Sequence, residues 1–396
     1  MSLVTRDADI DGAIQAARAE GRMGLDTEFM RERTYRARLC LVQVATRDSV
    51  VLIDPLQGAD LSGLGALIGD PNVEIVVHAG KQDLDIFYDR WGIVPTRVFD
   101  VQVAAGFAGY GASLPYGRLV ENLAAVTLTK GESYTDWCRR PLTAAQLSYA
   151  AADVLYLLPI ADRLTHELES RGRMGWVREE LRGLESEASY GADPRNAWRR
   201  VAGRGTLSPR QAAVLKELAA WREETASRRD IPRGWLVKDP TLVDIARRQP
   251  RGAGELKGIR GLNAKEAERS GPAIVAAVAE GQGGAPVPQE GASWPKTVLA
   301  RAKMLVGLAD AVARSRCEEA GIATELVVTR GEMESVLAEV VAGRLDESRH
   351  RLLQGWRNEL VGRHIVALSR GEIAVRAVDV PPYIEEVPVG WPTRTG

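Results

Sequence analysis

Short apolar runs alternate with helical spacing along the first part of the chain. Four runs have the length and residue types of strands, at residues 24–29, 39–45, 49–53 and 74–78. The first three lie close together in sequence and therefore predict an antiparallel meander. Helical spacing follows at 82–91 and 143–158. This alternation predicts a mixed-sheet α/β domain over residues 1–190.

Only helical patterns follow from residue 207 onward. Ser208-Pro209-Arg210-Gln211 predicts a helix start, with Ser as the N-cap and Pro at the first helical position. We expect two all-α domains at 207–280 and 295–375. Glycine-bearing stretches at 185–206 and 281–288 predict linkers, and the last twenty residues predict a loosely held tail.

The composition of the chain indicates the cellular compartment in which it is expected to act. The N-terminus has no basic-then-apolar signal pattern, and no apolar run is expected to be long enough to cross a bilayer. The three cysteines, Cys40, Cys138 and Cys317, are odd in number and lack metal-ligand spacing. They predict reduced thiols in a cytoplasmic protein without membrane contact. The formal net charge of −1 argues against coating nucleic acid with the whole surface but allows local basic patches.

Asp26 and Glu28 are two residues apart on a predicted strand, so their side chains point to the same face. Two neighbouring carboxylates in an apolar strand repel each other, and burial disfavours their charged forms. A divalent cation would remove that penalty. The alternative is an edge strand whose polar face lies in water.

Two further acids stand on predicted helices. Asp83 lies near the start of the helix at 82–91, where it could instead be a helix-start acid facing the dipole. Tyr149 and Asp153 are four residues apart and therefore share one helical face. Thr143 and Gln146 predict a capping box at the start of their helix. The alternative for this pair is a solvated aspartate beside a half-buried tyrosine.

The order of these residues resembles a known family. Asp26-Thr27-Glu28-Phe29, then Asp83 in the segment 78–84, then Tyr149 to Asp153 resemble the three motifs of the DEDD superfamily of 3′→5′ exonucleases, in its tyrosine branch. The sequence at 25–35, 136–137, 140–143 and 149–160 resembles the ribonuclease D family in particular. This resemblance extends over about residues 1–375. Lys81-Gln82 departs from the acidic residue expected just before Asp83.

This resemblance implies an RNase H-like exonuclease fold and a set of site residues. Four carboxylates are expected to hold two divalent ions, Mg²⁺ or Mn²⁺: Asp26, Glu28, Asp83 and Asp153. Tyr149 is expected to orient the attacking water. The residues expected to line the 3′ end are Thr27, Phe29 and His78. Gln43 could also line the 3′ end, although strand packing is favoured for this residue, and Trp137 either shapes the cleft or anchors the core.

The implied activity is exonucleolytic hydrolysis of RNA with a free 3′ end, releasing nucleoside 5′-monophosphates. Precursor tRNA is the expected substrate, and a monomer is the expected state. One alternative is a DNA-directed exonuclease of the same superfamily. The other is a non-catalytic RNA-binding scaffold, against which the complete set of four acids and Tyr149 argues.

The helical segment 207–280 resembles the HRDC domain shared by RecQ-type helicases and ribonuclease D, and 295–375 resembles a second, more divergent copy. Six arginines lie around Trp198, Trp221 and Trp235: Arg199, Arg200, Arg204, Arg228, Arg229 and Arg233. Arginine with aromatic residues suits single-stranded nucleic acid. The alternative is a solvated basic helical surface.

Overall fold

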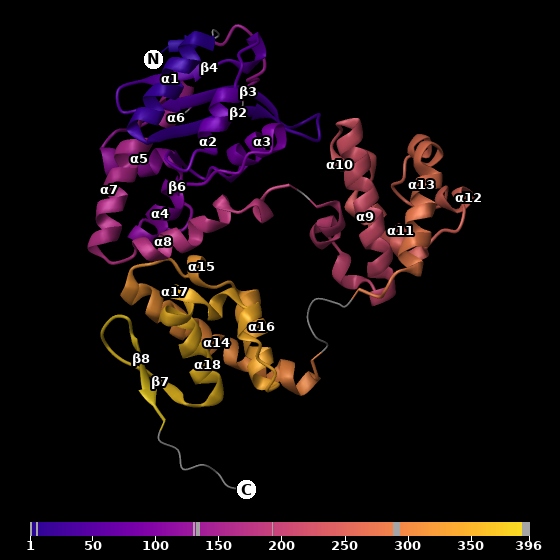
Figure 1. Cartoon of the computed structure of the whole chain (residues 1–396). Coiled ribbons are helices and arrows are strands. Elements are labelled where there is room, and N and C mark those ends of the chain that lie inside the picture. Colours follow the sequence, from indigo (N-terminus) through magenta and orange to yellow (C-terminus); the bar gives the residue numbers. More distant parts are fainter. Residues whose placement is uncertain are drawn as a thin grey trace.

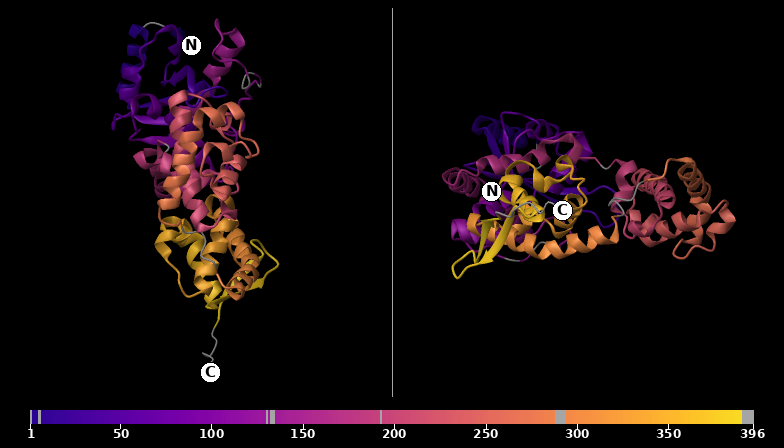
Figure 2. Two further views of the ribbon diagram at one scale, coloured as in Figure 1. Left: turned by 90° about the vertical axis from the view of Figure 1, so that its right-hand side faces the viewer. Right: turned by 90° about the horizontal axis from the view of Figure 1, so that it is seen from below.

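The computed structural model describes residues 2–4, 7–129, 131, 135–191, 193–287 and 294–389. Three units follow one another along the chain. An α/β unit holds the N-terminus, a first helical unit surrounds α9, and a second helical unit surrounds α14 (Figure 1). The first helical unit stands to one side of the other two (Figure 2).

The α/β unit is built on a mixed sheet of six strands in the order β1-β4-β3-β2-β5-β6. The strands are β1 (Ser2–Val4), β2 (Arg22–Met30), β3 (Arg38–Ala45), β4 (Val50–Ile53), β5 (Glu74–Val77) and β6 (Val98–Asp100). The predicted meander is confirmed, since β2, β3 and β4 pair in antiparallel fashion. β1 pairs in parallel with β4 at one edge, and β5 and β6 extend the sheet in parallel from β2 to the other edge. β1 and β6 escaped prediction because three residues carry too little periodicity.

Helices cover both faces of the sheet and separate two apolar cores. One face packs against α1 (Asp7–Glu20), α2 (Ser62–Ile68) and α3 (Lys81–Trp91). The other face packs against α4 (Val101–Ala108), α5 (Tyr116–Ala124), α6 (Ala144–Leu155), α7 (Leu157–Ser170) and α8 (Met174–Leu181). Leu25 belongs to the first core, so Asp26 and Glu28 face the α6 side of the sheet.

The helix expected over 143–158 is broken in two. The capping box of Thr143 and Gln146 is confirmed at its start, but α6 ends at Leu155 and α7 begins at Leu157. By length and composition alone, Ala144–Ser170 could cross a membrane, so the expectation that no run is long enough was wrong. In this fold the apolar residues of α6 and α7 pack on the sheet and on α4.

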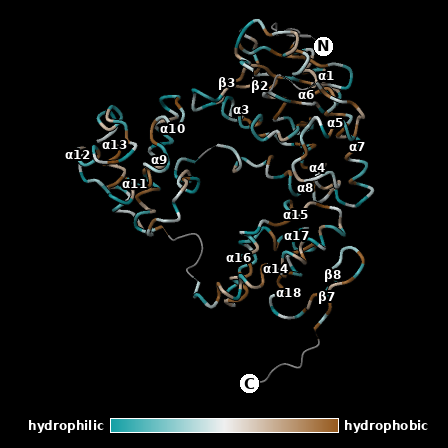
Figure 3. The backbone as a smooth tube through the Cα atoms, turned by 180° about the vertical axis from the view of Figure 1, so that it is seen from behind, coloured by the Kyte–Doolittle hydropathy of each residue, from teal (hydrophilic) through white to brown (hydrophobic). Residues whose placement is uncertain are grey.

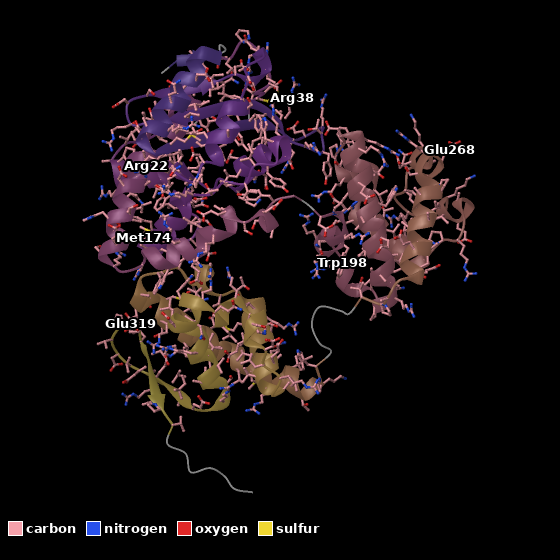
Figure 4. All side chains as sticks on the ribbon, viewed as in Figure 1. Arg22, Arg38, Met174, Trp198, Glu268 and Glu319 are labelled. Atoms are coloured by element: carbon pink, nitrogen blue, oxygen red, sulfur yellow. A yellow bond between two sulfur atoms is a disulfide. The ribbon has the colours of Figure 1, made fainter. Side chains whose placement is uncertain are left out.

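The first helical unit contains α9 (Pro209–Arg229), α10 (Arg233–Leu236), α11 (Asp239–Arg248), α12 (Ala253–Leu256) and α13 (Ala264–Gly283). The capping box at Ser208 is confirmed. The prediction of a linker at 185–206 was wrong. This stretch follows η2 (Arg182–Glu185) and forms the 3₁₀ turns η3 (Glu187–Ser189), η4 (Pro194–Arg200) and η5 (Arg204–Thr206). Trp198 and Val201 from this stretch are buried in the core of the first helical unit, where Figure 4 labels Trp198.

The second helical unit contains α14 (Lys296–Ala320), α15 (Thr324–Val327), α16 (Arg330–Val341), α17 (Gly355–Arg357) and α18 (Arg363–Arg370), with turns η6 (Glu347–Arg349), η7 (Arg351–Leu353) and the π-helical η8 (Asn358–Gly362). Hydrophilic and hydrophobic residues alternate along these helices, as expected when one face is buried (Figure 3). The prediction of a loosely held tail was wrong as far as residue 389, because β7 (Ile373–Ala377) pairs with β8 (Ile384–Pro388). Residues 390–396 lie outside the described part of the chain.

Two of the cysteines expected to be reduced are joined. Cys40 of β3 and Cys138, 98 residues later, form a disulfide with their Cα atoms 5.2 Å apart. Sequence separation concealed this pairing because the fold, and not local spacing, brings the two residues together. Cys317 is a buried free thiol.

The crossing of α9 and α13 depends on a glycine. A Cβ atom on Gly281 would lie 2.4 Å from the Val214 Cα atom, so the two backbones could not keep their distance. We expect Gly281→Ala to destabilise the first helical unit by roughly 1–3 kcal/mol, the usual cost of overpacking. Thermal unfolding of the full chain measures this change. Gly283→Ala is the matched control on the same helix, with open space around its Cβ position, and an equal loss in both variants would contradict the explanation.

Candidate functional site

Three carboxylates converge on the α6 face of the sheet. Asp26 and Glu28 come from β2, and Asp153 comes from α6, which packs across β2, β3 and β4. One carboxylate oxygen from each residue lies within 4.8 Å of the others. The structure therefore brings Asp153 to Glu28 and Asp26, which lie 125 and 127 residues earlier in the sequence.

The close approach and burial of these acids disfavour their charged forms. Burial, followed by the charges of Asp153 and Asp83, raises the pKa of Glu28 to about 8. Burial raises the pKa of Asp153 to about 7, against an opposing hydrogen bond from Tyr149. The pKa of Asp26 is raised well above its usual value by burial and by the charges of Asp83, Asp153 and Glu28. Without a cation, the site resists carrying its full negative charge.

Asp83 is buried at the first turn of α3 and approaches from the other side of β2. The Thr27 hydroxyl donates a hydrogen bond to the Asp83 carboxylate. Burial raises the pKa of Asp83 to about 6, while that hydrogen bond opposes the rise. Within the described residues Asp83 is not part of the converging group of three, but its charge acts on Asp26 and Glu28. Thr27, expected to contact substrate, has its hydroxyl engaged in holding Asp83.

Asp100 fixes the turn that leads into α3. Its buried carboxylate accepts hydrogen bonds from the backbone N–H groups of Ala79 (3.0 Å) and Gly80 (3.1 Å), immediately before α3 begins. It also caps α4 by accepting from the Gln102 N–H at 2.9 Å. Sequence reasoning missed Asp100. The available signal was an acid between an apolar strand and a helical pattern, where an N-cap is expected.

His78 and Tyr116 form an aromatic wall beside the carboxylates. Their ring centroids lie 5.4 Å apart, and His78 Nε2 lies 3.0 Å from the Leu114 carbonyl oxygen. The Tyr116 hydroxyl donates to the carbonyl oxygen of Ala152, next to Asp153, at 3.4 Å. Burial raises the pKa of Tyr116, and the charges of Asp153 and Asp26 add to the rise. Tyr116 was missed by sequence reasoning, since no local pattern marks it. Phe29 packs instead against the core on the α1 side of the sheet.

Gln43 lies opposite Asp26 in the β2–β3 ladder. Directly opposed residues of an antiparallel pair share a face with Cβ atoms about 5 Å apart. The Gln43 side chain is 0% exposed, and neither of its amide atoms has a hydrogen-bond partner among the described residues. A buried amide without partners is costly. Simple packing, which the sequence favoured, leaves this amide unexplained.

Trp137 anchors the core. The sequence had left two alternatives for this residue, a core anchor and a residue that shapes the cleft. Its ring is buried and lies 6.0 Å from the ring of Tyr149. The segment is held in place by Arg140, whose guanidinium binds the buried Asp54 carboxylate and the Cys40 carbonyl oxygen. The buried Trp137 ring thus packs beside the Tyr149 ring and restrains its position.

The donor set fits a hard divalent cation. Carboxylate oxygens are the preferred ligands of Mg²⁺ and Mn²⁺, and a cation would offset the repulsion that raises these pKa values. Asp26, Glu28 and Asp153 could hold such an ion directly, with Asp83 nearby. Tyr149 is hydrogen-bonded to Asp153, so its hydroxyl belongs to the same site.

Comparison with known proteins gives two family matches along the chain. A family model described as 3′-5′ exonuclease matches residues 1–169, and one described as HRDC domain matches residues 211–278. The first match includes both the β2 and the α6 carboxylates.

Similar proteins cover nearly the whole chain. Ribonuclease D of Gluconacetobacter diazotrophicus is 39% identical over 94% of this chain and 93% of its own length. Ribonuclease D of Jannaschia sp. is 39% identical over 92% of this chain and 94% of its own length. The crystal structure of Escherichia coli RNase D, described as an exoribonuclease involved in structured RNA processing, is 33% identical, covering 93% of this chain and 98% of its own, with a TM-score of 0.80.

The raised pKa of Asp26 predicts a pH-dependent stability. A carboxyl whose folded pKa lies above its unfolded value stabilises the fold below the unfolded pKa and loses that contribution as pH rises. In metal-free solution, Asp26→Asn should therefore be more stable than wild type at pH ~8, by a few degrees in Tm, with the gap closing towards pH ~4. Thermal unfolding in chelator over that pH range measures it.

Asp48→Asn is the control for this experiment, because Asp48 is exposed on the β3–β4 turn. It should leave the pH profile of Tm unchanged. Adding Mn²⁺ should stabilise wild type more than Asp26→Asn, since a ligand that binds only the folded state raises its stability. Identical wild-type and Asp26→Asn profiles in chelator would show that Asp26 is not electrostatically strained.

Proposed function

This chain belongs to the ribonuclease D family of 3′→5′ exoribonucleases, and on that basis we propose that it trims the 3′ ends of precursor tRNA and other small structured RNAs by two-metal-ion hydrolysis. Each cycle would release one nucleoside 5′-monophosphate. The observation that carries the proposal is the convergence of Asp26, Glu28 and Asp153 within 4.8 Å, with Asp83 beside them.

The four acids divide into two ligand sets. Asp26 is acted on by the charges of all three other acids, so it is the residue that would serve both ions. Glu28 and Asp153 would complete one set with Asp26, and Asp83 would belong to the other. Two bound Mg²⁺ or Mn²⁺ ions would supply an activated water and neutralise the negative charge on the non-bridging phosphate oxygens and on the departing 3′ oxygen.

Tyr149 would position the attacking water and not deprotonate it. A phenol has an ordinary pKa near ~10 and is a poor base at neutral pH. Its hydroxyl instead holds Asp153 through a hydrogen bond, and its ring is backed by Trp137. Asp83 would be held in its acceptor geometry by the Thr27 hydroxyl, so substrate contact at this point would fall to neighbouring groups such as the His78 ring.

The preference for structured RNA rests on the relatives. The Escherichia coli protein, similar over almost its whole length, is described as acting in structured RNA processing. The metal-binding acids themselves would hydrolyse DNA and RNA alike, so the helical units are the parts that would distinguish substrates. Working as a monomer is part of the proposal, since one chain contributes all four acids.

Replacing one metal-binding acid tests the proposal directly. We expect Asp153→Asn to lower kcat by at least about a thousandfold on single-stranded RNA with a free 3′ end. Wild type should shorten that RNA and a 3′-extended tRNA only with Mg²⁺ or Mn²⁺ present, and should leave RNA with a blocked 3′ end intact. Asp162→Asn is the control, because Asp162 is an exposed acid on α7 that binds Arg22.

Several outcomes would contradict the proposal. Full activity of Asp153→Asn would remove that residue from the site. Absence of metal-dependent shortening in wild type would favour a non-catalytic RNA-binding scaffold. Faster degradation of single-stranded DNA than of either RNA would favour a DNA-directed exonuclease.

Tyr149→Phe separates water positioning from metal binding. The variant keeps the ring against Trp137 but loses the hydroxyl, so we expect kcat to fall about 10- to 100-fold with the affinity for Mn²⁺ retained. Single-turnover kinetics give the rate of hydrolysis, and Mn²⁺ titration calorimetry gives the affinity. An unchanged rate would mean that the Tyr149 hydroxyl is only structural.

A further inference from the structure

A deep cleft separates the exonuclease unit from the first helical unit. It has a volume of about 1120 Å³. The β2–β3 connection and α3 form one wall, and η4, the end of α9 and the start of α10 form the other. None of the metal-binding acids lines it. The cleft is therefore separate from the carboxylate site, and residues of both units line it.

Specific hydrogen bonds hold the two walls together. The backbone N–H groups of Tyr35 and Arg36 donate to Asp230 Oδ1 at 3.0 and 3.2 Å. The Tyr35 hydroxyl donates to Glu223 Oε2 at 2.7 Å, and its ring packs on the core of the first helical unit. The connection between β2 and β3, which is the tip of the β2–β3 hairpin, is thereby fixed to α9. This attachment gives the cleft a defined width.

The cleft is rich in guanidinium groups that lack a close carboxylate partner among the described residues, although Arg31 and Arg36 act on Asp89 from a greater distance. Arg31 and Arg36 project from the hairpin wall, and Arg200 and Arg228 from the opposite wall. All four are exposed, and none forms an ion pair with another described residue. Four cations facing a common space repel one another unless a polyanion lies between them.

Two of the four lining acids are already satisfied. Glu223 is 1% exposed and is bound by Arg233 and by the Tyr35 hydroxyl, and Asp85 is bound by Lys81. Asp89, which is attracted by Arg36 and Arg31, and Glu224 are the two remaining acids against four arginines without an ion pair. The cleft therefore presents a surplus of positive charge, even though the whole chain has a net charge of −1.

An exposed aromatic ring stands at the edge of this surface. Trp235 is 63% exposed, and its neighbour Gly234 lines the cleft. Of the three tryptophans noted in this region of the sequence, Trp198 is buried and Trp221 is half-buried. An exposed indole beside arginines suits a nucleobase better than an acidic peptide, because bases stack on aromatic rings.

The cleft lies within reach of the carboxylate site. Arg31 directly follows Met30, the last residue of β2, so at ~3.3 Å per residue its Cα atom lies at most roughly 10 Å from the Cα atom of Glu28. An RNA strand whose 3′ end lies at the acids can therefore place nearby upstream phosphates against the cleft arginines.

We propose that this cleft binds the phosphodiester backbone of RNA upstream of the 3′-terminal nucleotides, with Arg31, Arg36, Arg200 and Arg228 as phosphate contacts and Trp235 as a stacking surface. The proposal rests on the proposed exoribonuclease function and adds a binding site for the part of the RNA that lies upstream of its 3′ end. RNA long enough to reach the cleft is held more tightly than a short oligonucleotide, and that extra affinity falls steeply with salt.

The test compares a double variant, Arg36→Ala/Arg228→Ala, with wild type on two RNAs. One is a hairpin with a single-stranded 3′ tail, and the other is a tetranucleotide. KM for the tailed hairpin should rise about tenfold at moderate salt, and the slope of log KM against log salt should fall by about 1 for each arginine removed. The variant should keep its kcat on the hairpin and its kcat/KM on the tetranucleotide.

Arg47→Ala/Arg370→Ala is the matched control, since both arginines are exposed and lie outside the cleft. Equal losses for the variant on both RNAs, or no change in KM for the hairpin, would overturn the cleft assignment. A polyglutamate peptide that competes with the hairpin as well as RNA of equal charge would overturn it in favour of an acidic protein partner.

Binding can be measured without catalysis. In the Asp153→Asn background, fluorescence anisotropy with the labelled hairpin should show the same loss of affinity for Arg36→Ala/Arg228→Ala, and a smaller loss for Trp235→Ala. If wild type failed to degrade any RNA, these affinities would still report on the cleft. Failure of the exonuclease proposal and failure of the cleft proposal are thus distinguishable.

Discussion

Burial raises the pKa of all four carboxylates in the exonuclease unit, and the charges of neighbouring acids raise it further for Asp26 and Glu28. An arrangement of this kind persists only if the surrounding structure prevents the acids from moving apart. The central position of β2 in the sheet and the packing of α6 across it provide that restraint. Thr27, Asp100 and Trp137 add smaller restraints on Asp83, on the turn before α3 and on Tyr149.

Sequence reasoning succeeded where the information is local. The alternation that put Asp26 and Glu28 on one face, the capping boxes at Thr143 and Ser208, and the meander of β2 to β4 all depend on residues close in the chain. Strands β1 and β6 are too short to show a period. The convergence of β2 with α6 came from the order of motifs that resembles a family, since spacing alone could not bring Asp153 to Asp26.

The errors have a common physical cause in long-range contacts. The stretch at 185–206 has the composition of a linker, but Trp198 and Val201 are buried by residues of the helices that follow. Asp100 and Tyr116 act on residues from other elements. The neighbours of Asp100 indicate only that it caps α4, and those of Tyr116 carry no local signal. The two helical units also differ in attachment. The second shares an apolar core with the exonuclease unit through stacked Trp176 and Trp356, whereas the first is joined largely by polar contacts of the hairpin.

The bond between Cys40 and Cys138 also acts on the chain when it is unfolded. It closes a loop spanning 98 residues of sequence, which covers most of the segment from β3 to the start of the α6 region. Closing a loop of that size removes conformational entropy from the unfolded ensemble worth on the order of 4–5 kcal/mol at room temperature. The folding equilibrium of the exonuclease unit is therefore linked to the thiol–disulfide balance of its surroundings, separately from any contact at the active site.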